Sequence, residues 1–485
     1  MKVTLIHVGS TISNFGFRVI GAVIRRRFPD TALHFVMGGN IRSLANIIMA
    51  NSGSGLADKD IGRVAKALAA HEVIGFACMT EHAGTVKRLI AELRRLRPDA
   101  YILWGGIHAM LHPEDAIGHA DAVCTSEGEK AAPQLLARLE DGEDPTVVEN
   151  FWFRRGDGEI IRNEFQTLLS TQEMEALPHP VYRENELIYD PAQGFRPTRT
   201  GDYLNSEALS YVTIWSRGCP FRCSFCANSR LLEMDRDYGR VRHASVDHLI
   251  EEVRRAVDRS AHISSVTFQD DCFISLPEDV LREFADKWRR RIGLPFSIQG
   301  LTPAHTRREK LAILMGGGLN RVRLGVQSGS DRILKFYKRP NRAGLVREAV
   351  EAVGSFAKQM VPPAYDIILD NPIETADDVK DTLRLIQDMP RPFTLNVFSL
   401  RHIPNTELGR QLARLEVELE GIDRNYSKVR PTYANALFYL VAFIRLPAPL
   451  FDFALRFAKP YRQSSQRFGF LVWMFRTLFF VRRAM

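Results

Sequence analysis

The chain alternates apolar strands with amphipathic helices in two long runs, and this alternation limits its fold more than any other feature. In the first run, short apolar segments are separated by stretches whose apolar residues recur at helical spacing. Alternating strands and helices predict a doubly wound parallel sheet, in which ligands bind beyond the carboxyl ends of the strands. The expected strands are 3–8, 33–37, 73–79, 101–104 and 120–124, and the expected helices are 17–28, 61–70 and 85–96.

The second run contains six strand-and-helix units and predicts an open, partial (β/α)6 barrel with its active site at the carboxyl ends of the strands. Ser275, followed three residues later by Glu278, predicts a capping box at the start of one helix, and Thr375 is expected to cap another. The expected strands are 211–215, 265–268, 296–300, 322–326, 365–369 and 394–400, and the expected helices are 246–257, 277–290, 343–356 and 376–389.

These patterns predict an α/β protein with four regions. Residues 1–145 form the doubly wound domain, and the proline-interrupted segment 146–208 is expected to be a linker. Residues 209–415 form the partial barrel, and 416–485 form a helical carboxyl-terminal region. With 485 residues, 45% of them hydrophobic and 25% charged, the chain is long enough and apolar enough for several cores. This composition excludes a disordered chain and a multi-span membrane protein.

Cysteine content and charge indicate the compartment and exclude one class of partner. Six cysteines are too few for a disulfide scaffold, and the opening residues 1–10 read as a buried strand, so a cytoplasmic protein is expected. The net charge is +8, but residues 431–485 hold eight basic residues and one acidic residue. The remaining chain is nearly neutral, so no nucleic-acid partner is expected.

Three cysteines with the spacing C-x-x-x-C-x-x-C follow the first expected barrel strand: Cys219, Cys223 and Cys226. Three thiolates on one loop can ligate three irons of a 4Fe-4S cluster and leave the fourth iron open to another ligand. Structural zinc requires a fourth protein ligand, and the next cysteine, Cys272, belongs to a different strand-and-helix unit. The loop therefore predicts a cluster with an open iron.

This loop, with Phe225 before its third cysteine, resembles the signature of the radical S-adenosylmethionine (radical SAM) superfamily. The resemblance implies that the open iron binds the methionyl group of SAM and that the reduced cluster cleaves it to a 5′-deoxyadenosyl radical. It also implies an electron donor such as a flavodoxin or ferredoxin. The residues matching SAM-contacting positions of the family are Phe225, Gln269, Asp270, Asp271, Gln327 and Ser328, whereas Asp370 and Ile373 stand where the family commonly has glycine.

The first run resembles the cobalamin-binding domain of cobalamin-dependent radical SAM enzymes. The matching segments are 104–109, 113–114, 121 and 127–129, and the D-x-H-x-x-G motif that supplies a cobalt-ligating histidine elsewhere is absent. The alternative is a domain of this fold that binds no corrin and packs on the barrel. The cobalamin contacts implied by the resemblance are Ser10, Thr11, Thr80, Gly105, Gly106, His108, Glu127 and Gly128.

Two other groups of cysteines bear on the function. The related methylthiotransferases carry a second cluster in their amino-terminal domain, but this chain offers only Cys78 and Cys124 there, both in apolar strands. A second cluster is therefore not expected. Cys272 follows the second barrel strand, where its thiol either donates hydrogen to an intermediate as a catalytic residue or packs in the core.

The carboxyl-terminal segment 431–485 is dense in aromatic and basic residues. Its apolar runs end before the ~20 residues that are needed to cross a bilayer. The two readings left open are peripheral contact with an anionic membrane surface, and protein packing as a helical cap over the barrel or as a dimer contact. Contact with lipid at the inner membrane face would favour a lipophilic substrate.

The leading interpretation is a cobalamin-dependent radical SAM enzyme that methylates an unactivated carbon of a small, lipophilic molecule. The first alternative is oxidative cyclisation or rearrangement of a lipid or tetrapyrrole, because related domain pairs perform both kinds of chemistry. The second alternative is a sensor that binds the cluster or corrin without turnover.

Overall fold

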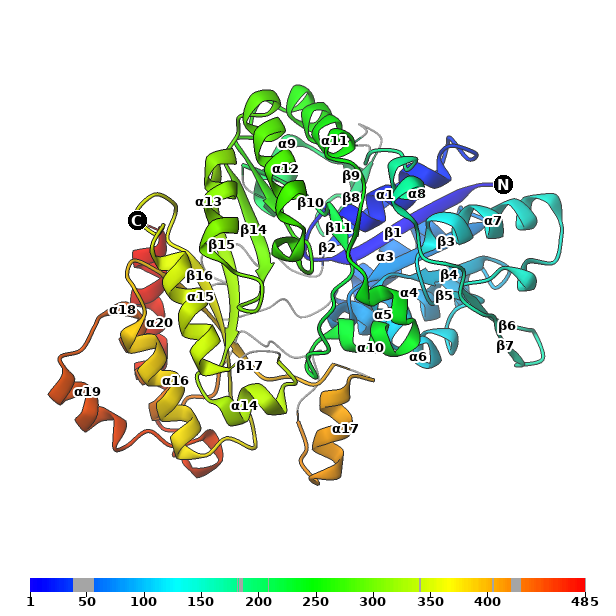
Figure 1. Ribbon diagram of the computed structural model, residues 1–485. Helices are drawn as coiled ribbons and strands as arrows, with labels where there is room; N and C mark the ends of the chain where they lie inside the picture. Colours follow the sequence, from blue (N-terminus) through cyan, green and yellow to red (C-terminus); the bar gives the residue numbers. More distant parts are fainter. Residues whose placement is uncertain are drawn as a thin grey trace. The chain divides into compact units, whose positions relative to one another are not determined.

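The computed structural model describes two compact units, residues 1–209 and 210–485 (Figure 1). The description omits residues 38–55, 181, 183–185, 208, 340–341, 404, 420–428 and 485, together with the side chains of 205–207 and 479–484. Each unit is built on its own sheet, and the boundary between the units lies just before the first strand of the expected barrel.

The first unit is a nine-stranded sheet in the order β7-β6-β5-β4-β3-β1-β2-β8-β9. Its five central strands are parallel, and apolar helix faces cover both sides of the sheet. Helices α3 (Asp58–Leu68) and α4 (Ala83–Leu96) pack on one side, and α1 (Phe15–Ile24) and α7 (Gly128–Asp141) pack on the other. The predicted doubly wound sheet is therefore confirmed. The central strands are β1 (Val3–Gly9), β2 (Ala32–Met37), β3 (Val73–Cys78), β4 (Tyr101–Gly105) and β5 (Ala122–Cys124).

The segment 146–208, which was expected to be a linker, instead adds strands to both edges of this sheet. The added strands are β6 (Phe151–Arg154), β7 (Ile160–Arg162), β8 (Leu187–Asp190) and β9 (Gly194–Pro197). Three of their four pairings are antiparallel. These strands have only three or four residues each, too few to show periodicity in a polar segment. Helices α8 (Thr171–Glu175) and α9 (Thr200–Glu207) complete the segment, which belongs to the first compact unit.

A fully buried ion pair joins α1 to the start of β8. Arg18 Nη1 lies 2.8 Å from Glu186 Oε2, and neither side chain is exposed. The guanidinium also donates to the carbonyl of Ile12 and lies 3.9 Å from the ring centre of Tyr182. Because every direction around Arg18 is occupied by a partner, its charge is buried without being isolated.

Replacing Glu186 with alanine is expected to lower the free energy of unfolding by about 3–5 kcal/mol, because it leaves the buried charge of Arg18 without its counterion. Chemical denaturation of the full chain measures this difference. The matched control is Glu140→Ala, since Glu140 pairs with Arg27 at 3.4 Å on an exposed surface. That change is expected to cost about 0–1 kcal/mol. Equal losses of unfolding free energy in the two variants would contradict a stabilising role of the buried Arg18–Glu186 pair.

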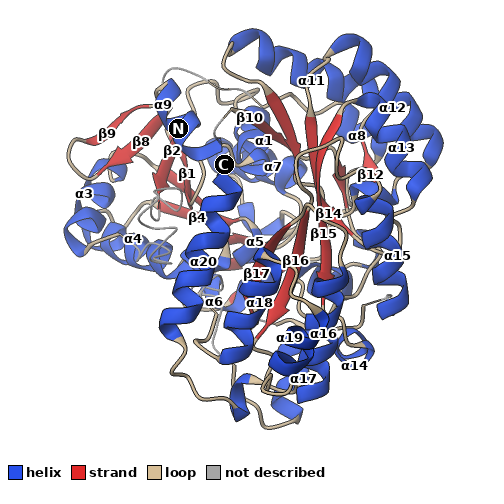
Figure 2. Cartoon of the chain, turned by 90° about the vertical axis from the view of Figure 1, so that its left-hand side faces the viewer, coloured by secondary structure: helices blue, strands red, loops and turns tan. Residues whose placement is uncertain are grey.

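The second unit contains six parallel strands that follow chain order across the sheet, β10-β13-β14-β15-β16-β17 (Figure 2). This order confirms the partial (β/α)6 barrel. The strands are β10 (Ser210–Thr213), β13 (Ser265–Phe268), β14 (Phe296–Leu301), β15 (Leu319–Gln327), β16 (Ala364–Leu369) and β17 (Thr394–Ser399). The helices between them include α11 (Val246–Arg259), α12 (Glu278–Arg291), α13 (Arg308–Gly317), α14 (Asp331–Phe336), α15 (Ala343–Gly354) and α16 (Ala376–Asp388).

One of the two predicted helix caps is confirmed and the other is wrong. Thr375 caps α16 in a capping box with Asp378. Ser275 does not cap α12, whose first flanking residue is Pro277. Instead, the Ser275 hydroxyl donates to the carbonyl of Cys272 at 2.7 Å across a short 3₁₀ turn. Ser275 is the last residue of this turn, and Leu276 and Pro277 separate it from the helix, so spacing alone misled the prediction.

The carboxyl-terminal region is helical, as predicted, and belongs to the same compact unit as the barrel. Its helices are α18 (Tyr433–Phe443), α19 (Ala448–Leu455) and α20 (Gly469–Ala484), and α17 (Glu407–Arg414) precedes it at the end of the barrel region. Helix α18 packs against α16, and α20 lies along α18 (Figures 1 and 2). Among the described residues, no helix combines the length and hydrophobicity that crossing a membrane requires.

Candidate functional site

The three predicted metal-binding cysteines lie on one loop after β10. Two short strands, β11 (Ser216–Arg217) and β12 (Arg242–His243), pair antiparallel at the base of this cysteine loop. Cys219 and Cys223 are buried, and Cys226 is half-buried at the residue that precedes α10 (Ala227–Met234). A helix amino terminus favours a thiolate, so the position of Cys226 suits a metal-binding sulfur.

Backbone contacts hold the cysteine loop from both sides. The N–H of Cys219 donates to the carbonyl of Tyr238 at 3.0 Å, and the N–H of Ser224 donates to that of Tyr337 at 2.9 Å. Gly218 has φ +102°, and a Cβ atom there would lie 2.4 Å from the carbonyl oxygen of Arg240. Only glycine fits this turn, which starts the loop in the direction of the cysteines.

Asp270, which was expected to contact SAM, holds the start of the cysteine loop. Its carboxylate accepts from the N–H of Trp215 at 3.0 Å and from the N–H and hydroxyl of Ser216 at 2.6 and 2.5 Å. Burial raises the pKa of Asp270 to about 7. Asp271 and Gln269, beside it at the end of β13, are exposed. These two residues have side chains open to a ligand at this strand end.

The segment with Gln327 and Ser328, which was expected to contact SAM, has an unusual backbone. Gln327 adopts φ +70° at the end of β15, a conformation that side-chain-bearing residues rarely take. Ser328 is fully buried, and its hydroxyl bonds to that of Thr382 at 3.1 Å. Phe225, the aromatic residue of the cysteine loop, packs edge-on against Tyr337 at 5.1 Å between ring centres. Strained backbone clusters at ligand sites, so Gln327 remains the better ligand contact of this segment.

Arg339 is a residue of the site that the sequence reasoning missed. Its Nη1 donates to the sulfur of Cys223 at 3.4 Å, and its Nη2 donates to the carbonyl of Gly325 at 2.6 Å. The guanidinium therefore places a positive charge directly beside a cysteine of the loop. The only sequence signal was a cation a few residues beyond the segment 325–330, which is not specific.

Cys272 lies closer to the cysteine loop than its separation along the chain suggested. Its side chain is fully buried, and its thiol is hydrogen-bonded to that of Cys219. The end of β13 thus brings Cys272 to the loop, although Cys272 belongs to a different strand-and-helix unit. With Cys272 included, four thiols lie at the loop, which is also the number that a structural zinc site requires. The number of thiols therefore does not distinguish an iron-sulfur cluster from zinc.

The spacing of the sulfurs does separate these two readings. A tetrahedral zinc site with Zn–S bonds of about 2.3 Å requires all of its sulfurs to lie about 3.8 Å apart. Within the described residues, three or more ligand atoms of His, Cys, Asp or Glu converge within 4.8 Å of one another only at His108, His112 and Asp115. The thiols of the loop thus do not converge on one ion, whereas in a 4Fe-4S cluster each thiolate binds a different iron. The donor set fits a cluster.

A buried carboxyl behind the loop makes the stability of the barrel depend on pH. Glu252 accepts from the Thr213 hydroxyl at 2.7 Å and from the Tyr211 hydroxyl at 3.1 Å, and burial raises its pKa to about 7. In the unfolded chain the pKa of a glutamate is about 4.3. Between about pH 4.3 and 7 the folded state therefore binds a proton that the unfolded state has lost. Stability is then full below about pH 4 and declines as the pH rises to about 7.

The variant Glu252→Gln is expected to reduce this decline, because glutamine keeps the acceptor oxygen and carries no charge. At pH 8 it should raise the free energy of unfolding by about 1–3 kcal/mol relative to the parent chain. Denaturant unfolding at pH 5.5 and pH 8 measures the effect, with Glu251→Gln on the exposed face of the same helix as control. An unchanged pH dependence in Glu252→Gln would contradict the role of this carboxyl.

The residues expected to bind cobalamin lie at the carboxyl ends of neighbouring parallel strands. Ser10 and Thr11 follow β1, Thr80 follows β3, Gly105 ends β4, and Gly106 follows it. The segment after β5 leads to Glu127 and Gly128 at the start of α7. Gly106 has φ +83°, and a Cβ atom there would lie 3.1 Å from the N atom of Cys78, so only glycine suits this turn.

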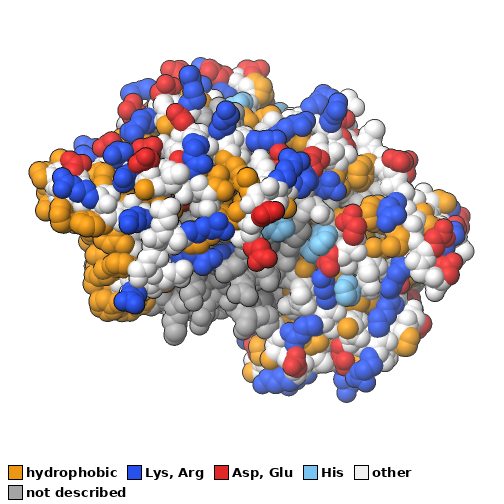
Figure 3. Space-filling view, turned by 90° about the horizontal axis from the view of Figure 1, so that it is seen from below, with side chains coloured by type: hydrophobic (Ala, Val, Ile, Leu, Met, Phe, Trp, Pro, Cys, Tyr) orange, Lys and Arg blue, Asp and Glu red, His pale blue; other side chains and the backbone are white. Residues whose placement is uncertain are grey.

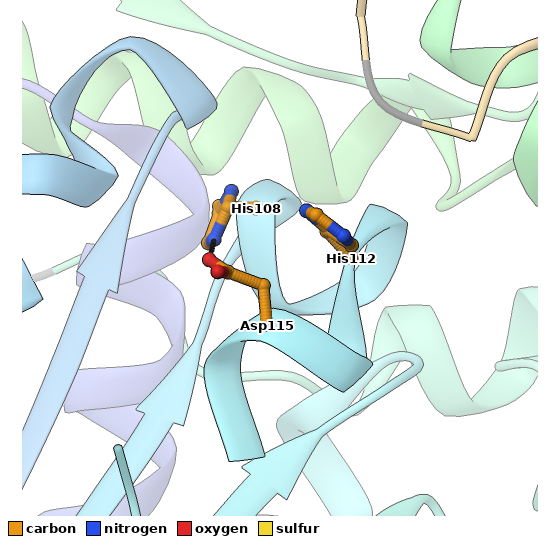
Figure 4. A group of neighbouring side chains, drawn as sticks. All are labelled: His108, His112 and Asp115. Atoms are coloured by element: carbon orange, nitrogen blue, oxygen red, sulfur yellow. Dashed lines mark hydrogen bonds and ion pairs between the residues drawn. The ribbon is translucent and has the colours of Figure 1, made fainter. Parts of the chain in front are cut away.

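His108 points toward Asp115, and His112 lies beside this pair (Figure 4). The His108 Nε2 atom lies 3.0 Å from Asp115 Oδ2, and Lys87 Nζ lies 2.6 Å from Asp115 Oδ1. Burial lowers the pKa of His108, so its imidazole is neutral near pH 7. The His108 Nδ1 atom is buried and has no hydrogen-bond partner in the described chain. A polar atom of this kind fits a ligand that carries hydrogen-bonding amides, as a corrin does.

The first unit does not offer a second cysteine-bound cluster. Cys78 and Cys124 are buried in β3 and β5, and burial raises the pKa of each thiol to about 12. Thiols in such surroundings are inert. The expectation that a cluster belongs to the barrel rather than to this unit agrees with these positions.

A parallel partial barrel with three thiols on the loop after its first strand defines the class of radical SAM proteins. The profile of the Radical SAM superfamily matches residues 213–386, and that of the B12 binding domain matches residues 1–136. Residues 213–386 therefore form a radical SAM domain, and residues 1–136 form a B12 binding domain that precedes it in the chain. The family predicted from the cysteine loop is thus confirmed.

Two curated relatives place this family membership in context. The uncharacterized methyltransferase PH0819 of Pyrococcus horikoshii is 25% identical over 323 residues, covering 66% of this chain and 64% of that protein. The anaerobic magnesium-protoporphyrin IX monomethyl ester cyclase of Synechocystis sp. is 22% identical over 295 residues, covering 57% of this chain and 52% of that protein. The chain therefore spans about half to two thirds of the length of these relatives.

A solved structure supports the arrangement of the fold. The radical SAM methyltransferase TsrM from Kitasatospora setae, determined with cobalamin and a [4Fe-4S] cluster bound, superimposes with a TM-score of 0.65 at 15% identity. The match covers 86% of this chain and 75% of TsrM. At this identity the likeness concerns the fold, and it confirms the predicted order of a B12-binding unit followed by a radical SAM barrel.

Proposed function

We propose that this chain is a cobalamin-dependent radical SAM enzyme that transfers a methyl group to a carbon atom of a small molecule. The observation that carries the proposal is the loop of Cys219, Cys223 and Cys226, whose thiols do not converge on one ion. The B12-binding profile in the same chain and the resemblance to the methyltransferase PH0819 support methyl transfer.

The chain's own residues suggest how this site would operate. Cys219, Cys223 and Cys226 would ligate the cluster, and the positive charge of Arg339 beside Cys223 would stabilise the electron-rich reduced state. Burial and Cys223 raise the pKa of the metal-free Cys226 thiol to about 12, so metal binding must displace its proton. When bound, the cluster would supply the electron that cleaves SAM, and cobalamin would supply the methyl group.

Contacts to SAM would come from the strand ends around the loop. The exposed Asp271 and Gln269 suit the methionyl ammonium, and Gln327 suits a ribose hydroxyl. Asp270 and Ser328 would act indirectly, by holding the loop and the β15 end in place. At the other unit, His108 Nδ1 and the strand-end residues Ser10, Thr11 and Thr80 would face the corrin, with Gly105, Gly106, Glu127 and Gly128 beside them.

Cleavage of SAM tests the enzyme proposal directly. The chain is reconstituted anaerobically with iron and sulfide, loaded with hydroxocobalamin, and incubated with SAM and a chemical reductant. Release of 5′-deoxyadenosine and bound corrin after desalting are the expected results. Bound cluster and corrin without SAM cleavage would favour the sensor alternative, and iron-free protein that retains zinc would contradict both readings.

The contact between Cys272 and Cys219 suggests a separate experiment on the proposed hydrogen donor. If Cys272 donates hydrogen to an intermediate, Cys272→Ala should still bind four irons and cleave SAM but should form less product per cleavage. Metal analysis, 5′-deoxyadenosine and product are measured together. If the variant loses its metal instead, Cys272 is a fourth ligand and the open iron is contradicted.

The two relatives favour different outcomes for the substrate. Resemblance to PH0819 favours methylation, whereas resemblance to the anaerobic cyclase keeps oxidative cyclisation of a tetrapyrrole as the second candidate. Incubation with SAM labelled in its methyl group separates them, because only methylation transfers the label. We further propose a lipophilic substrate, a flavodoxin or ferredoxin as electron donor, and a cytoplasmic location, where the six free cysteines would stay reduced.

A further inference from the structure

The carboxyl-terminal segment is attached firmly to the barrel through its first helix. Asp370 adopts φ +59° after β16, and its carboxylate accepts from the N–H of Arg430 at 3.0 Å and the amide of Asn435 at 2.8 Å. Farther along, the amide of Gln387 donates to the carbonyl of Leu446 at 2.6 Å. These contacts hold α18 against α16, so the helices that follow are presented from a fixed base.

Beyond α18, large apolar side chains are exposed at high density. Half of the fourteen exposed large hydrophobic residues described in the whole chain fall between Ile444 and Leu478. All four aromatic residues of that set are here, with exposures of 58% for Phe453, 54% for Phe457, 69% for Phe470 and 49% for Trp473. Such concentration on one surface marks an interaction site, whereas scattered apolar residues do not.

The aromatic residues of this surface contact one another in two groups. Phe453 lies 5.3 Å from Phe457, and Phe457 contacts Tyr433, which in turn contacts Phe468 at the start of α20. Phe470 and Trp473 pair at 6.0 Å on the next turn. In Figure 3, hydrophobic side chains gather at the left-hand edge, the edge where Figure 1 places α19 and α20. We call this surface the aromatic patch.

The charged residues of the segment that forms the aromatic patch are almost entirely positive. Four exposed basic residues lie in or between α19 and α20: Arg456, Lys459, Arg462 and Arg467. Asp452 is the only acidic residue between positions 431 and 485. A covering protein of ordinary composition would need an unusually acidic rim, whereas a bilayer containing anionic lipid supplies negative headgroups above a hydrocarbon interior.

We propose that the aromatic patch binds the surface of a membrane that contains anionic lipid. Phe and Trp side chains occupy the boundary between headgroups and acyl chains, and the surrounding Arg and Lys side chains contact the headgroup phosphates. The short helices α19 and α20 would lie on the surface. This proposal does not depend on the cluster or on the reaction.

Vesicle flotation of the cluster-loaded full chain tests the proposal. The protein is expected to float with vesicles of 70% phosphatidylcholine and 30% phosphatidylglycerol, to stay behind with pure phosphatidylcholine, and to be released by 0.5 M salt. Each basic residue contributes about fivefold to the partition coefficient, so Arg456→Gln with Lys459→Gln should lower it by about 25-fold. Phe453→Ser with Phe457→Ser should abolish flotation.

The matched control replaces an exposed cation and an exposed apolar residue of the same unit outside the patch, Lys358→Gln with Val361→Ser. This variant should float like the parent chain, and all variants should keep their iron content and unfolding temperature. Equal binding to neutral and anionic vesicles, or binding to neither, would overturn the proposal. A dimer of the parent chain in light scattering, absent from the Phe453→Ser, Phe457→Ser variant, would also overturn the proposal. In that case a second copy of the chain would cover the patch.

Discussion

Replacing Cys223 with alanine is expected to remove the cluster and to reduce release of 5′-deoxyadenosine by more than about 100-fold. Changes in groups that only support a metal ligand commonly cost 10–100-fold, and loss of a ligand should exceed them. Cys223 is also the thiol that receives the hydrogen bond from Arg339, so the variant removes that contact. Iron analysis, Mössbauer spectra of oxygen-free protein and chromatography of the nucleoside product measure the effect.

The control for this variant is Cys124→Ala, which removes a buried thiol from the first unit and keeps the three cysteines of the loop. Its iron content and its rate of SAM cleavage should match those of the parent chain. If Cys223→Ala retained its iron and cleaved SAM at the parent rate, the assignment of the loop as the cluster site would be wrong.

Replacing Gly218 with alanine is expected to prevent cluster assembly although all three cysteines remain. At φ +102° an alanine costs about 1–3 kcal/mol in backbone strain alone. Its Cβ would in addition lie 2.4 Å from the carbonyl oxygen of Arg240, which is backbone and cannot turn away. The loop must then leave the position in which its thiols are held, and bound iron should fall to the level of Cys223→Ala.

Gly316→Ala is the matched control for this prediction, because a Cβ at Gly316 meets no atom within 4 Å and the residue lies in α13. Alanine in a helix interior is expected to stabilise by about 0.5–1 kcal/mol, with no change in bound iron. Full iron content in Gly218→Ala would show that the loop tolerates another conformation and would contradict the role of the turn.

Much of the fold could be predicted because strand and helix periodicities are local. Each central strand of both sheets was placed within a few residues, since these strands are buried and therefore continuously apolar. The edge strands of the segment 146–208 were missed because they have few residues and one face open to solvent. The predicted cap at Ser275 failed because Ser275 ends a short 3₁₀ turn and Pro277 takes the position before the helix, which spacing cannot reveal.

The candidate site also has features that the sequence predicted and features that it did not. The cysteine loop and the family were predictable, because three ligands close in sequence form a pattern that few other functions share. Arg339 and the Cys272 contact were not, since each reaches the loop from a different strand-and-helix unit. The Asp270 and Asp271 pair showed acidic groups at a strand end, but which of them is open to a ligand depended on the partners of each side chain.

For this chain, the sequence by itself determined the central strands of the two sheets, the order of the sheets along the chain, and the loop that would hold the metal. These features depend on residues that are neighbours in the sequence. Only the tertiary structure decided which carboxylate supports the loop, which cation touches its sulfur, and which face of the carboxyl-terminal helices is left uncovered. Those properties depend on contacts between residues far apart in the chain, and such contacts exist only once the strands have been brought side by side.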